Sequence, residues 1–354
     1  MLTGQPSTIS GCAGATDEVK QFSIENNAGT KLIVSNYGAA VQSLFVKDRQ
    51  GKLIDIVLGY DDANDYVTDE CYIGTIVGRY ANRIAGESVS INGSNYKLTT
   101  KEGGYHHHGG KLGFNKKIFD AVPFRQQNRN GIVFKYTSPH LEEGFPGELK
   151  LQVIYTLNEH DSWIVEYKAI SNKTTLVNLS QHTYFNLSGN PAKDIGEHRL
   201  KIMSDCYLPV NELQVPTGEL ADVKNTAFDF SIAKKIARDI EKEDEQLKLS
   251  NGYDHSFVLE RKHTPALKHA AVVTESSSGI RMDVYTTEPA VHFYSGNCLQ
   301  NVKGKKGIIY NKHSGFCLET QHFPDAPNQP HFPSTVLNAG DIFSSKTIFK
   351  FSTK

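Results

Sequence analysis

Hydrophobic and polar residues alternate along most of the chain, and a period of two residues predicts β-strands. The alternating runs are short and are separated by turn residues such as Asn-Gly, Gly and Pro. Clear examples are ELKLQVIYTL, WIVEYKAIS and AVHFYSGN, at residues 148–157, 163–171 and 290–297. Convincing amphipathic helices are scarce, so we expect an all-β fold of mostly antiparallel strands.

One segment has a helical rather than a strand-like period. In SIAKKIARDIEKEDE, residues 231–245, three isoleucines recur at four-residue spacing: Ile232, Ile236 and Ile240. Apolar residues at this spacing share one face of a helix. We therefore predict a surface helix over residues 231–245.

The chain shows no internal division. Its 354 residues are 38% hydrophobic, which is enough to bury one large core, and no Gly-rich linker, charge run or repeat interrupts them. The first residues are rich in Gly, Ser and Thr, as loose termini often are. We expect a single large antiparallel β-sandwich over residues 21–354, preceded by a loose N-terminal extension over residues 1–20.

Charge and cysteine content narrow the range of partners. The 38 basic and 39 acidic residues leave a net charge of -1, which provides no field to attract nucleic acid or an anionic membrane surface. The five cysteines are scattered and include no C-x-x-C pair, so neither a disulfide framework nor a thiolate zinc site is indicated. The start of the chain does not resemble a signal peptide, and no segment is apolar enough to cross a bilayer. We expect a soluble, cytoplasmic protein with reduced thiols.

Two strand-like segments each carry one group that is able to transfer protons. Glu319 lies in GFCLETQHFPDAPN, in an apolar strand that runs into a turn containing Pro324, Asp325 and Pro327. A carboxylate there is either ion-paired for structure or kept as an acid or base. His182 lies among β-formers in NLSQHTYFNLSG, and its side chain titrates near neutral pH. Alone, each residue has an ordinary structural explanation, but together they are the two groups that acid–base catalysis needs.

Further polar clusters point to a neutral sugar. GRYANRI contributes Arg79, Asn82 and Arg83, whose directional donors suit vicinal hydroxyl groups, although Arg79 fits an internal ion pair equally well. YHHHGG places three histidines in a row at residues 106–108, but neighbours on an extended chain point in opposite directions, so we expect one of them to function. GYDHSFVL supplies Asp254, for which a turn role is the common one. Metal motifs, phosphate-binding glycine loops and nucleophile elbows are absent from the sequence.

These motifs together resemble the aldose 1-epimerase (galactose mutarotase) family. GRYANRI, HHGG, EEGFPG, QHTYFNLSG, GYDHSFVL and GFCLETQHFPDAPN occur in the order and at roughly the spacing of that family, from about Gln21 to Phe351. The resemblance implies a galactose mutarotase-like supersandwich with an open cleft for a hexose. It also implies that Glu319 is the catalytic base and His182 the catalytic acid. The residues that it assigns to sugar binding are Asn82, Arg83, His108, Asp254 and His292, the last standing where the family usually has Gln.

The implied reaction needs one base and one acid, with neither metal nor organic cofactor. The anomeric hydroxyl of a free aldohexose loses a proton while the ring oxygen gains one, and the ring then closes on the other face. We expect an ionised Glu319 to raise the pKa of His182 above its usual value of about 6.5. We also expect a monomer, and little effect from His107, which stands where the family usually has Leu.

Three alternatives remain open from the sequence. A non-catalytic sugar-binding or regulatory protein could keep the same fold, but it would not need both His182 and Glu319. A glycoside hydrolase usually needs two carboxylates rather than a histidine and a glutamate. A hexose-6-phosphate 1-epimerase would need additional basic residues for the phosphate, and the composition indicates none.

Overall fold

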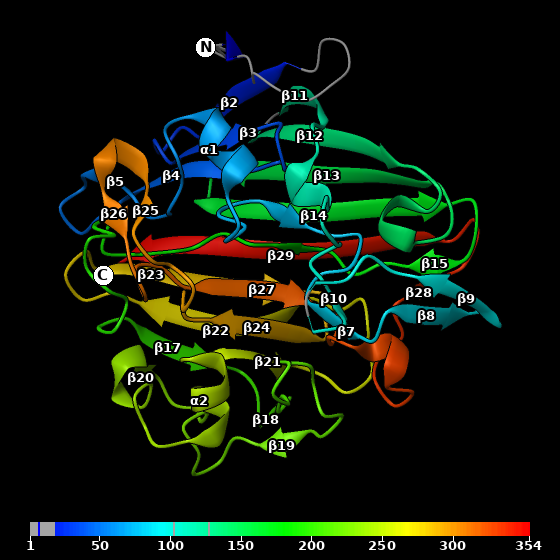
Figure 1. Ribbon diagram of the computed structural model, residues 1–354. Coiled ribbons are helices and arrows are strands. Elements are labelled where there is room, and N and C mark those ends of the chain that lie inside the picture. The colour runs from blue at the N-terminus through cyan, green and yellow to red at the C-terminus, as the bar shows by residue number, and fades with distance from the viewer. Residues whose placement is uncertain (1–5, 8–17, 102, 127) are drawn as a thin grey trace.

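The structure, a computed structural model, describes residues 6–7, 18–101, 103–126 and 128–354 (Figure 1). Most of the expected N-terminal extension, residues 1–5 and 8–17, lies outside the described residues. The rest is a β protein with antiparallel sheets, which confirms the expected fold class. No helix among the described residues is long and apolar enough to cross a membrane.

The largest sheet has nine strands and runs through the centre of the molecule (Figure 1). In spatial order its strands are β11 (Asp120–Gln126), β12 (Arg129–Ser138), β13 (Leu149–Asn158), β14 (Ser162–Ser171), β29 (Ile342–Thr353), β23 (Ile280–Thr286), β22 (Lys268–Thr274), β17 (Arg199–Ile202) and β20 (Lys234–Lys235). The C-terminal strand β29 pairs with β14 on one side and β23 on the other, so the end of the chain joins the two halves of the sheet.

Two five-stranded sheets accompany it. The N-terminal sheet consists of β1 (Pro6–Ser7), β2 (Val19–Glu25), β3 (Lys31–Ser35), β4 (Val41–Lys47) and β5 (Leu53–Asp55). The second, which we call the site sheet, consists of β19 (Ala221–Asp222), β18 (Cys206–Tyr207), β21 (Asp254–Val258), β24 (Ala290–Tyr294) and β27 (Cys317–Gln321). In Figure 1 the site sheet overlaps β22 and β23 of the central sheet.

Short elements complete the fold. Five two-stranded ladders pair β10 (Tyr105–His107) with β7 (Arg83–Ala85), β15 (Thr175–Leu176) with β28 (Val336–Leu337), β16 (Ser180–Gln181) with β6 (Ile76–Val77), β25 (Val302–Lys303) with β26 (Ile309–Tyr310) and β8 (Ser88–Ile91) with β9 (Ser94–Lys97). The helical elements are α1 (Ala63–Thr68), α2 (Glu245–Ser250) and the 3-10 turns η1 (Phe114–Lys116), η2 (Glu142–Gly144), η3 (Ile236–Arg238), η4 (Lys305–Gly307) and η5 (Ala326–Asn328).

The alternation of apolar residues places one face of each sheet in a shared core. Along β14, Trp163, Val165 and Tyr167 are buried, and Trp163 stacks on Phe349 of β29 with ring centroids 5.0 Å apart. Phe293 of the site sheet belongs to the same core cluster. Burial of such side chains stabilises the fold by about 1.5–3 kcal/mol each. This core fixes the site sheet as a rigid platform.

The predicted helix over residues 231–245 is wrong. The segment forms strand β20 and the turn η3, and α2 begins only at its last residue. Ile232 is 80% exposed whereas Ile236 is buried, so the isoleucines do not share one face. Lys234 pairs with Leu200 of β17, and its ammonium donates to the Ala227 carbonyl and the Asp239 carboxylate, both at 2.6 Å. This tertiary pairing outweighs a weak local helical preference.

Candidate active site

Three adjacent strands of the site sheet place the acidic residues and one histidine on the same face. Glu319 in β27 lies directly opposite His292 in β24, which lies opposite Ser256 in β21. Asp254 comes two residues before Ser256 and therefore points to the same side of the pleat. The strand period that was visible in the sequence thus brings together Glu319, His292 and Asp254.

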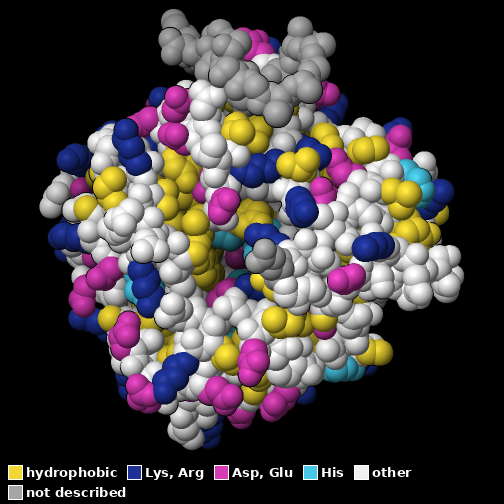
Figure 2. All heavy atoms as spheres, in the orientation of Figure 1, with side chains coloured by type: hydrophobic (Ala, Val, Ile, Leu, Met, Phe, Trp, Pro, Cys, Tyr) yellow, Lys and Arg dark blue, Asp and Glu magenta, His cyan; other side chains and the backbone are white. Residues whose placement is uncertain are grey.

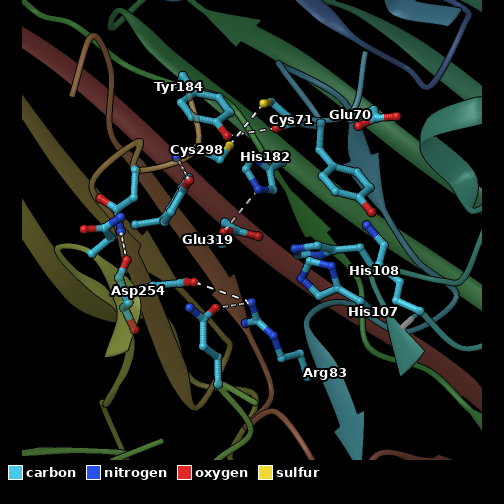
Figure 3. Close-up of a pocket in the computed structure, with 17 residues that line it drawn as sticks. Glu70, Cys71, Arg83, His107, His108, His182, Tyr184, Asp254, Cys298 and Glu319 are labelled. Atoms are coloured by element: carbon cyan, nitrogen blue, oxygen red, sulfur yellow. Dashed lines mark hydrogen bonds and ion pairs between the residues drawn. The ribbon is translucent and has the colours of Figure 1, made fainter. Parts of the chain in front are cut away.

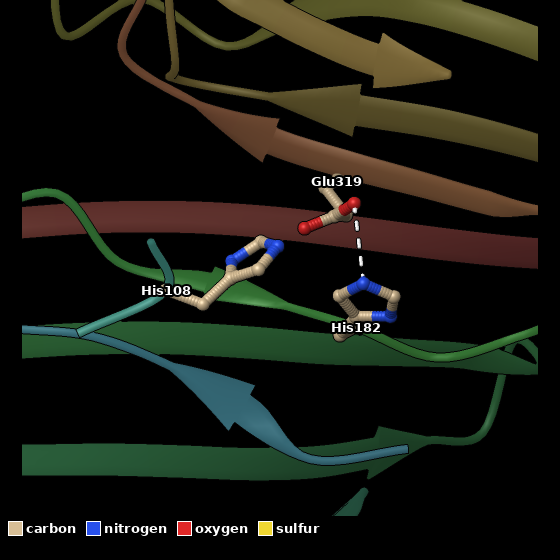
Figure 4. Close-up of side chains that lie close together, drawn as sticks. All are labelled: His108, His182 and Glu319. Atoms are coloured by element: carbon tan, nitrogen blue, oxygen red, sulfur yellow. Dashed lines mark ion pairs between the residues drawn. The ribbon is translucent and has the colours of Figure 1, made fainter. Parts of the chain in front are cut away.

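His182 reaches the same place from another part of the chain. It directly follows β16, and its backbone N–H donates to the Thr75 carbonyl at 2.8 Å. The ring stacks on Tyr72, with centroids 5.7 Å apart, and its Nε2 lies 3.7 Å from Oε1 of Glu319 (Figure 4). That separation is longer than a hydrogen bond, so each group is free to contact a different atom of a bound molecule.

Glu319 is the least satisfied charged group of the site. It is 1% exposed, and its Oε2 has no hydrogen-bond partner. A buried carboxylate without partners favours the protonated form. Burial, reinforced by the charge of Asp254, accordingly raises the pKa of Glu319 well above its usual value.

The expected rise in the pKa of His182 is wrong. Burial lowers it from 6.5 to about 4, because the ring lies among apolar and aromatic side chains and has lost its water. Glu319 does not oppose this shift, since its own carboxyl is driven towards the neutral form. Burial therefore disfavours the charged form of both groups.

His108 and Asn82 are linked by two hydrogen bonds, and both have a strained backbone conformation. Both residues have left-handed conformations, with φ of 47° and 63°. The N–H of His108 donates to the Asn82 carbonyl at 3.1 Å, and the N–H of Asn82 donates to Nδ1 of His108 at 3.2 Å. Since Nδ1 is an acceptor and burial keeps the pKa of the ring well below 6.5, His108 is neutral with its proton on Nε2. It can offer this donor to a ligand.

Arg83 and Asp254 form the charged wall of the site. Arg83 Nη2 lies 3.7 Å from Oδ2 of Asp254 and donates to Oε1 of Gln214 at 2.5 Å, while its buried Nε has no partner. His292 Nε2 contacts the other Asp254 oxygen at 2.6 Å, and His292 Nδ1 contacts Ser256 Oγ at 2.9 Å. Burial opposes ionisation of Asp254. The hydrogen bond from His292 and the charge of Arg83 outweigh this effect and hold the pKa of Asp254 below its usual value. Asp254 is thus an ionised acceptor.

These groups surround an open cleft of about 320 Å³. Figure 2 shows a hollow near the middle of one face of the molecule, with histidine and acidic side chains inside it, and Figure 3 shows the arrangement of its lining. Of the residues expected from the sequence, Arg83, His108, His182, Asp254 and Glu319 line the cleft. Asn82 and His292 do not: their side chains lie behind it, where His292 orients Asp254 and the Asn82 side chain accepts from the Arg83 N–H at 2.9 Å.

Arg79, the other arginine of GRYANRI, is structural. It is buried away from the cleft and donates to the carbonyls of Pro146 and Gly147, both at 3.0 Å. It thus has internal partners, but they are carbonyls and the hydroxyls of Ser138 and Thr175 rather than the carboxylate of an ion pair.

Donor atoms of His108, His182 and Glu319 lie within 4.8 Å of one another. Two imidazoles and a carboxylate are a donor set that transition metals accept. The same three groups are also able to hydrogen-bond to hydroxyl groups.

Comparison with known proteins identifies the family. The aldose 1-epimerase family profile matches residues 20–350. The chain belongs to the aldose 1-epimerase family. It is 42% identical to galactose mutarotase of Bos taurus over 335 residues, 94% of each chain, and 35% identical to aldose 1-epimerase of Escherichia coli over 332 residues, 93% of this chain and 94% of that protein. A solved aldose epimerase homologue from C. elegans superimposes with a TM-score of 0.85 at 30% identity, covering 94% of this chain and 98% of that one.

Several residues that line the cleft of this aldose 1-epimerase family member were not singled out from the sequence. They are Glu70, Cys71, Tyr72, Lys101, Tyr184, Gln214, Ser250, Asn251, Tyr294, Asn297 and Cys298. His107, from which little effect is expected, also lines the cleft. Tyr184 and Tyr294 lie within quoted motifs, HTYFNL and FYSGN, so their motif position was an available signal. Gln214 had none, because it comes from a loop that only the tertiary fold brings to Arg83.

Proposed function

We propose that the protein interconverts the α and β anomers of free aldohexoses such as D-galactose and D-glucose. The observation that carries the proposal is the buried Glu319 carboxyl with an unpartnered oxygen, 3.7 Å from the His182 ring in an open cleft. The anomeric hydroxyl and the ring oxygen of a pyranose are bonded to the same carbon. An acid and a base that serve both must therefore lie close together, as these two groups do.

Each proton transfer can be assigned to one residue. Ionised Glu319 accepts the proton of the anomeric hydroxyl while protonated His182 donates to the ring oxygen. The C1–O5 bond breaks and leaves an open-chain aldehyde. Rotation about C1–C2 and the reverse transfers then close the ring on the other face. General acid–base catalysis contributes about 10²–10⁴-fold for each such group.

The remaining groups of the cleft orient the sugar. Neutral His108 donates through Nε2, ionised Asp254 accepts, and Arg83 retains an unpaired Nε donor. Three rigid polar groups hold a pyranose in one pose, which is the condition for an acid and a base to act on adjacent oxygens. Tyr72, stacked on His182, adds an apolar wall.

The charge of the cleft supports a neutral sugar over a sugar phosphate. Its described lining has the acidic side chains of Glu70, Asp254 and Glu319 and only two basic ones, Arg83 and Lys101. Arg83 is already balanced by Asp254. A phosphate dianion would find no surplus positive charge there. A monomeric, cytoplasmic protein stays a prediction from the sequence.

Polarimetry on freshly dissolved α-D-galactose and α-D-glucose tests the proposal. We expect the folded protein to accelerate the approach to anomeric equilibrium in proportion to its concentration. The same measurement on α-D-glucose 6-phosphate should give a much lower kcat/KM. If the rates with both free sugars equal the buffer control, the protein is not a mutarotase.

A further inference from the structure

Two thiols from distant parts of the sequence meet at the side of the cleft. Cys71 lies in the loop between α1 and β6, and Cys298 lies in the loop that follows β24, yet their Sγ atoms are 3.1 Å apart (Figure 3). Both residues line the cleft. Cys298 is exposed and Cys71 is half-buried, so dissolved oxidants reach the pair.

We propose that Cys71 and Cys298 form a reversible disulfide that joins two walls of the cleft, with a peroxide or oxidised glutathione as the oxidant. An S–S bond is about 2.05 Å long, so the sulfurs need to approach by about 1 Å. Small rotations of the two side chains provide that movement. The other described thiols have different neighbours: Cys206 Sγ accepts from Arg261, and Cys317 Sγ lies 3.5 Å from Nδ1 of His182.

The surroundings make Cys298 the attacking thiolate. The hydrogen-bonding contact with the Cys71 sulfur 3.1 Å away, supported by the hydroxyls of Tyr294 and Tyr184, lowers the pKa of Cys298 from 9.0 to about 7 against the opposing effect of burial. The same interaction raises the pKa of Cys71, which keeps its proton. A thiolate fraction near neutral pH is what thiol oxidation requires.

The chemistry balances with a peroxide as the oxidant. The Cys298 thiolate attacks one peroxide oxygen, the O–O bond breaks, and hydroxide leaves with that electron pair, giving a sulfenic acid. The Cys71 sulfur then attacks the Cys298 sulfur, its proton passes to the departing oxygen, and water leaves as the S–S bond forms. With oxidised glutathione, the Cys298 thiolate attacks one sulfur and displaces one glutathione thiolate to give a mixed disulfide. Cys71 then attacks the Cys298 sulfur, gives up its proton and displaces the second glutathione in reduced form.

The bond would restrain residues next to the proposed acid. Cys71 precedes Tyr72, which stacks on His182. Cys298 follows Asn297, whose amide donates to the carbonyls of Ser250 and Tyr253 at 2.8 and 3.0 Å. Shifts of about 1 Å in groups that position a substrate can cost up to about 100-fold in rate. We therefore expect the oxidised protein to turn over at least about tenfold more slowly, an effect that rests on the proposed function.

Covalent mapping of the full chain tests the bond without reference to activity. Reduced, desalted protein is treated with hydrogen peroxide or oxidised glutathione, quenched with an alkylating agent and digested without reduction. We expect a Cys71–Cys298 cross-linked peptide, the mass loss of two hydrogens in the intact protein, and reversal of both by dithiothreitol. A cross-link through Cys12 or Cys206 instead, or sulfinic acid and stable mixed disulfides alone, would overturn the proposal.

Matched variants complete the test. Cys71→Ser and Cys298→Ser should each abolish the mass loss, whereas Cys206→Ser should retain it and keep the parental reduced-state activity. If one serine variant does not fold, the other variant and the parental peptide map still decide. In polarimetry, oxidation should slow the parental protein reversibly and leave Cys71→Ser unaffected. An unchanged rate in protein carrying the mapped bond would refute the effect on the cleft. Lack of activity in both redox states would refute the proposed function, while the peptide map would still decide on the bond.

Discussion

Replacement of Glu319 by Gln is the sharpest test of the proposed chemistry. The two side chains have nearly the same size, so the site sheet should keep its packing around this 1% exposed position. Because no group among the described residues hydrogen-bonds to Oε2, the substitution breaks no hydrogen bond within the protein at this atom. What it removes is the ability to take up and return a proton.

The expected loss of activity follows from the missing proton acceptor. General acid–base groups contribute about 10²–10⁴-fold, so the barrier should rise by about 3–5 kcal/mol. The loss should fall on kcat, with the KM for galactose within about threefold of the parental value, because Arg83, His108 and Asp254 still bind the sugar. The melting temperature should change little.

The assay is polarimetry at several galactose concentrations, with the spontaneous rate subtracted. Glu166→Gln is a matched control, since Glu166 pairs with Lys346 on the surface of the central sheet, with Nζ and Oε1 3.0 Å apart. It should retain parental kinetics. A Glu319→Gln protein that is folded and keeps kcat within about threefold would show that Glu319 is not the base.

Three further predictions concern the pKa of His182, the pH dependence of stability and the role of His292. His182 should be neutral at pH 6 and titrate near its pKa of about 4, as ¹⁵N chemical shifts of the imidazole would report; a titration above 6.5 would contradict the assigned role of burial. The free energy of unfolding should fall as the pH drops from 6.5 towards 4, because the unfolded chain binds protons that buried histidines such as His106, His182 and His198 refuse, each adding up to about 1.4 kcal/mol per pH unit in chemical denaturation. The raised pKa values of Glu319, Asp69 and Asp325 act in the opposite sense, but the buried histidines with lowered pKa values, which also include His107, His108 and His255, outnumber them. His292→Phe should raise the KM by about tenfold, because it removes the 2.6 Å contact that orients Asp254, while His292→Gln should restore much of the affinity; equal KM values for the two variants would refute a positioning role.

The sequence predicted the residues of the site better than it predicted their environment. The two-residue period identified the strand carrying His292, and an apolar run before a turn identified the strand carrying Glu319. The ordered motifs pointed to His182 and Asp254. Whether a residue lines the cleft or stands behind it depends on packing between distant segments. Asn82 and His292 are not among the lining residues and hydrogen-bond to Arg83 and Asp254, while their predicted contact with sugar stays a prediction. The sequence also could not predict the direction of the His182 pKa shift, because that direction depends on how deeply the tertiary structure buries the ring.

Burial of Glu319 and His182 affects the relative stability of the closed and open forms of the sugar in the proposed scheme. With a ring-closed sugar in the proposed scheme, Glu319 is ionised and His182 is protonated. Once the ring has opened, the proton has left His182 and another has arrived on Glu319, so both residues are neutral. Burial raises the pKa of Glu319 and lowers that of His182, and it therefore favours the pair that accompanies the open-chain sugar. In the proposed scheme, burial of this pair thus favours the open-chain intermediate over the closed ring, and it does so for either anomer. A catalyst that opens the ring of both anomers benefits from stabilising the open-chain form that they share. A site that instead stabilised one closed anomer would slow the release of that anomer.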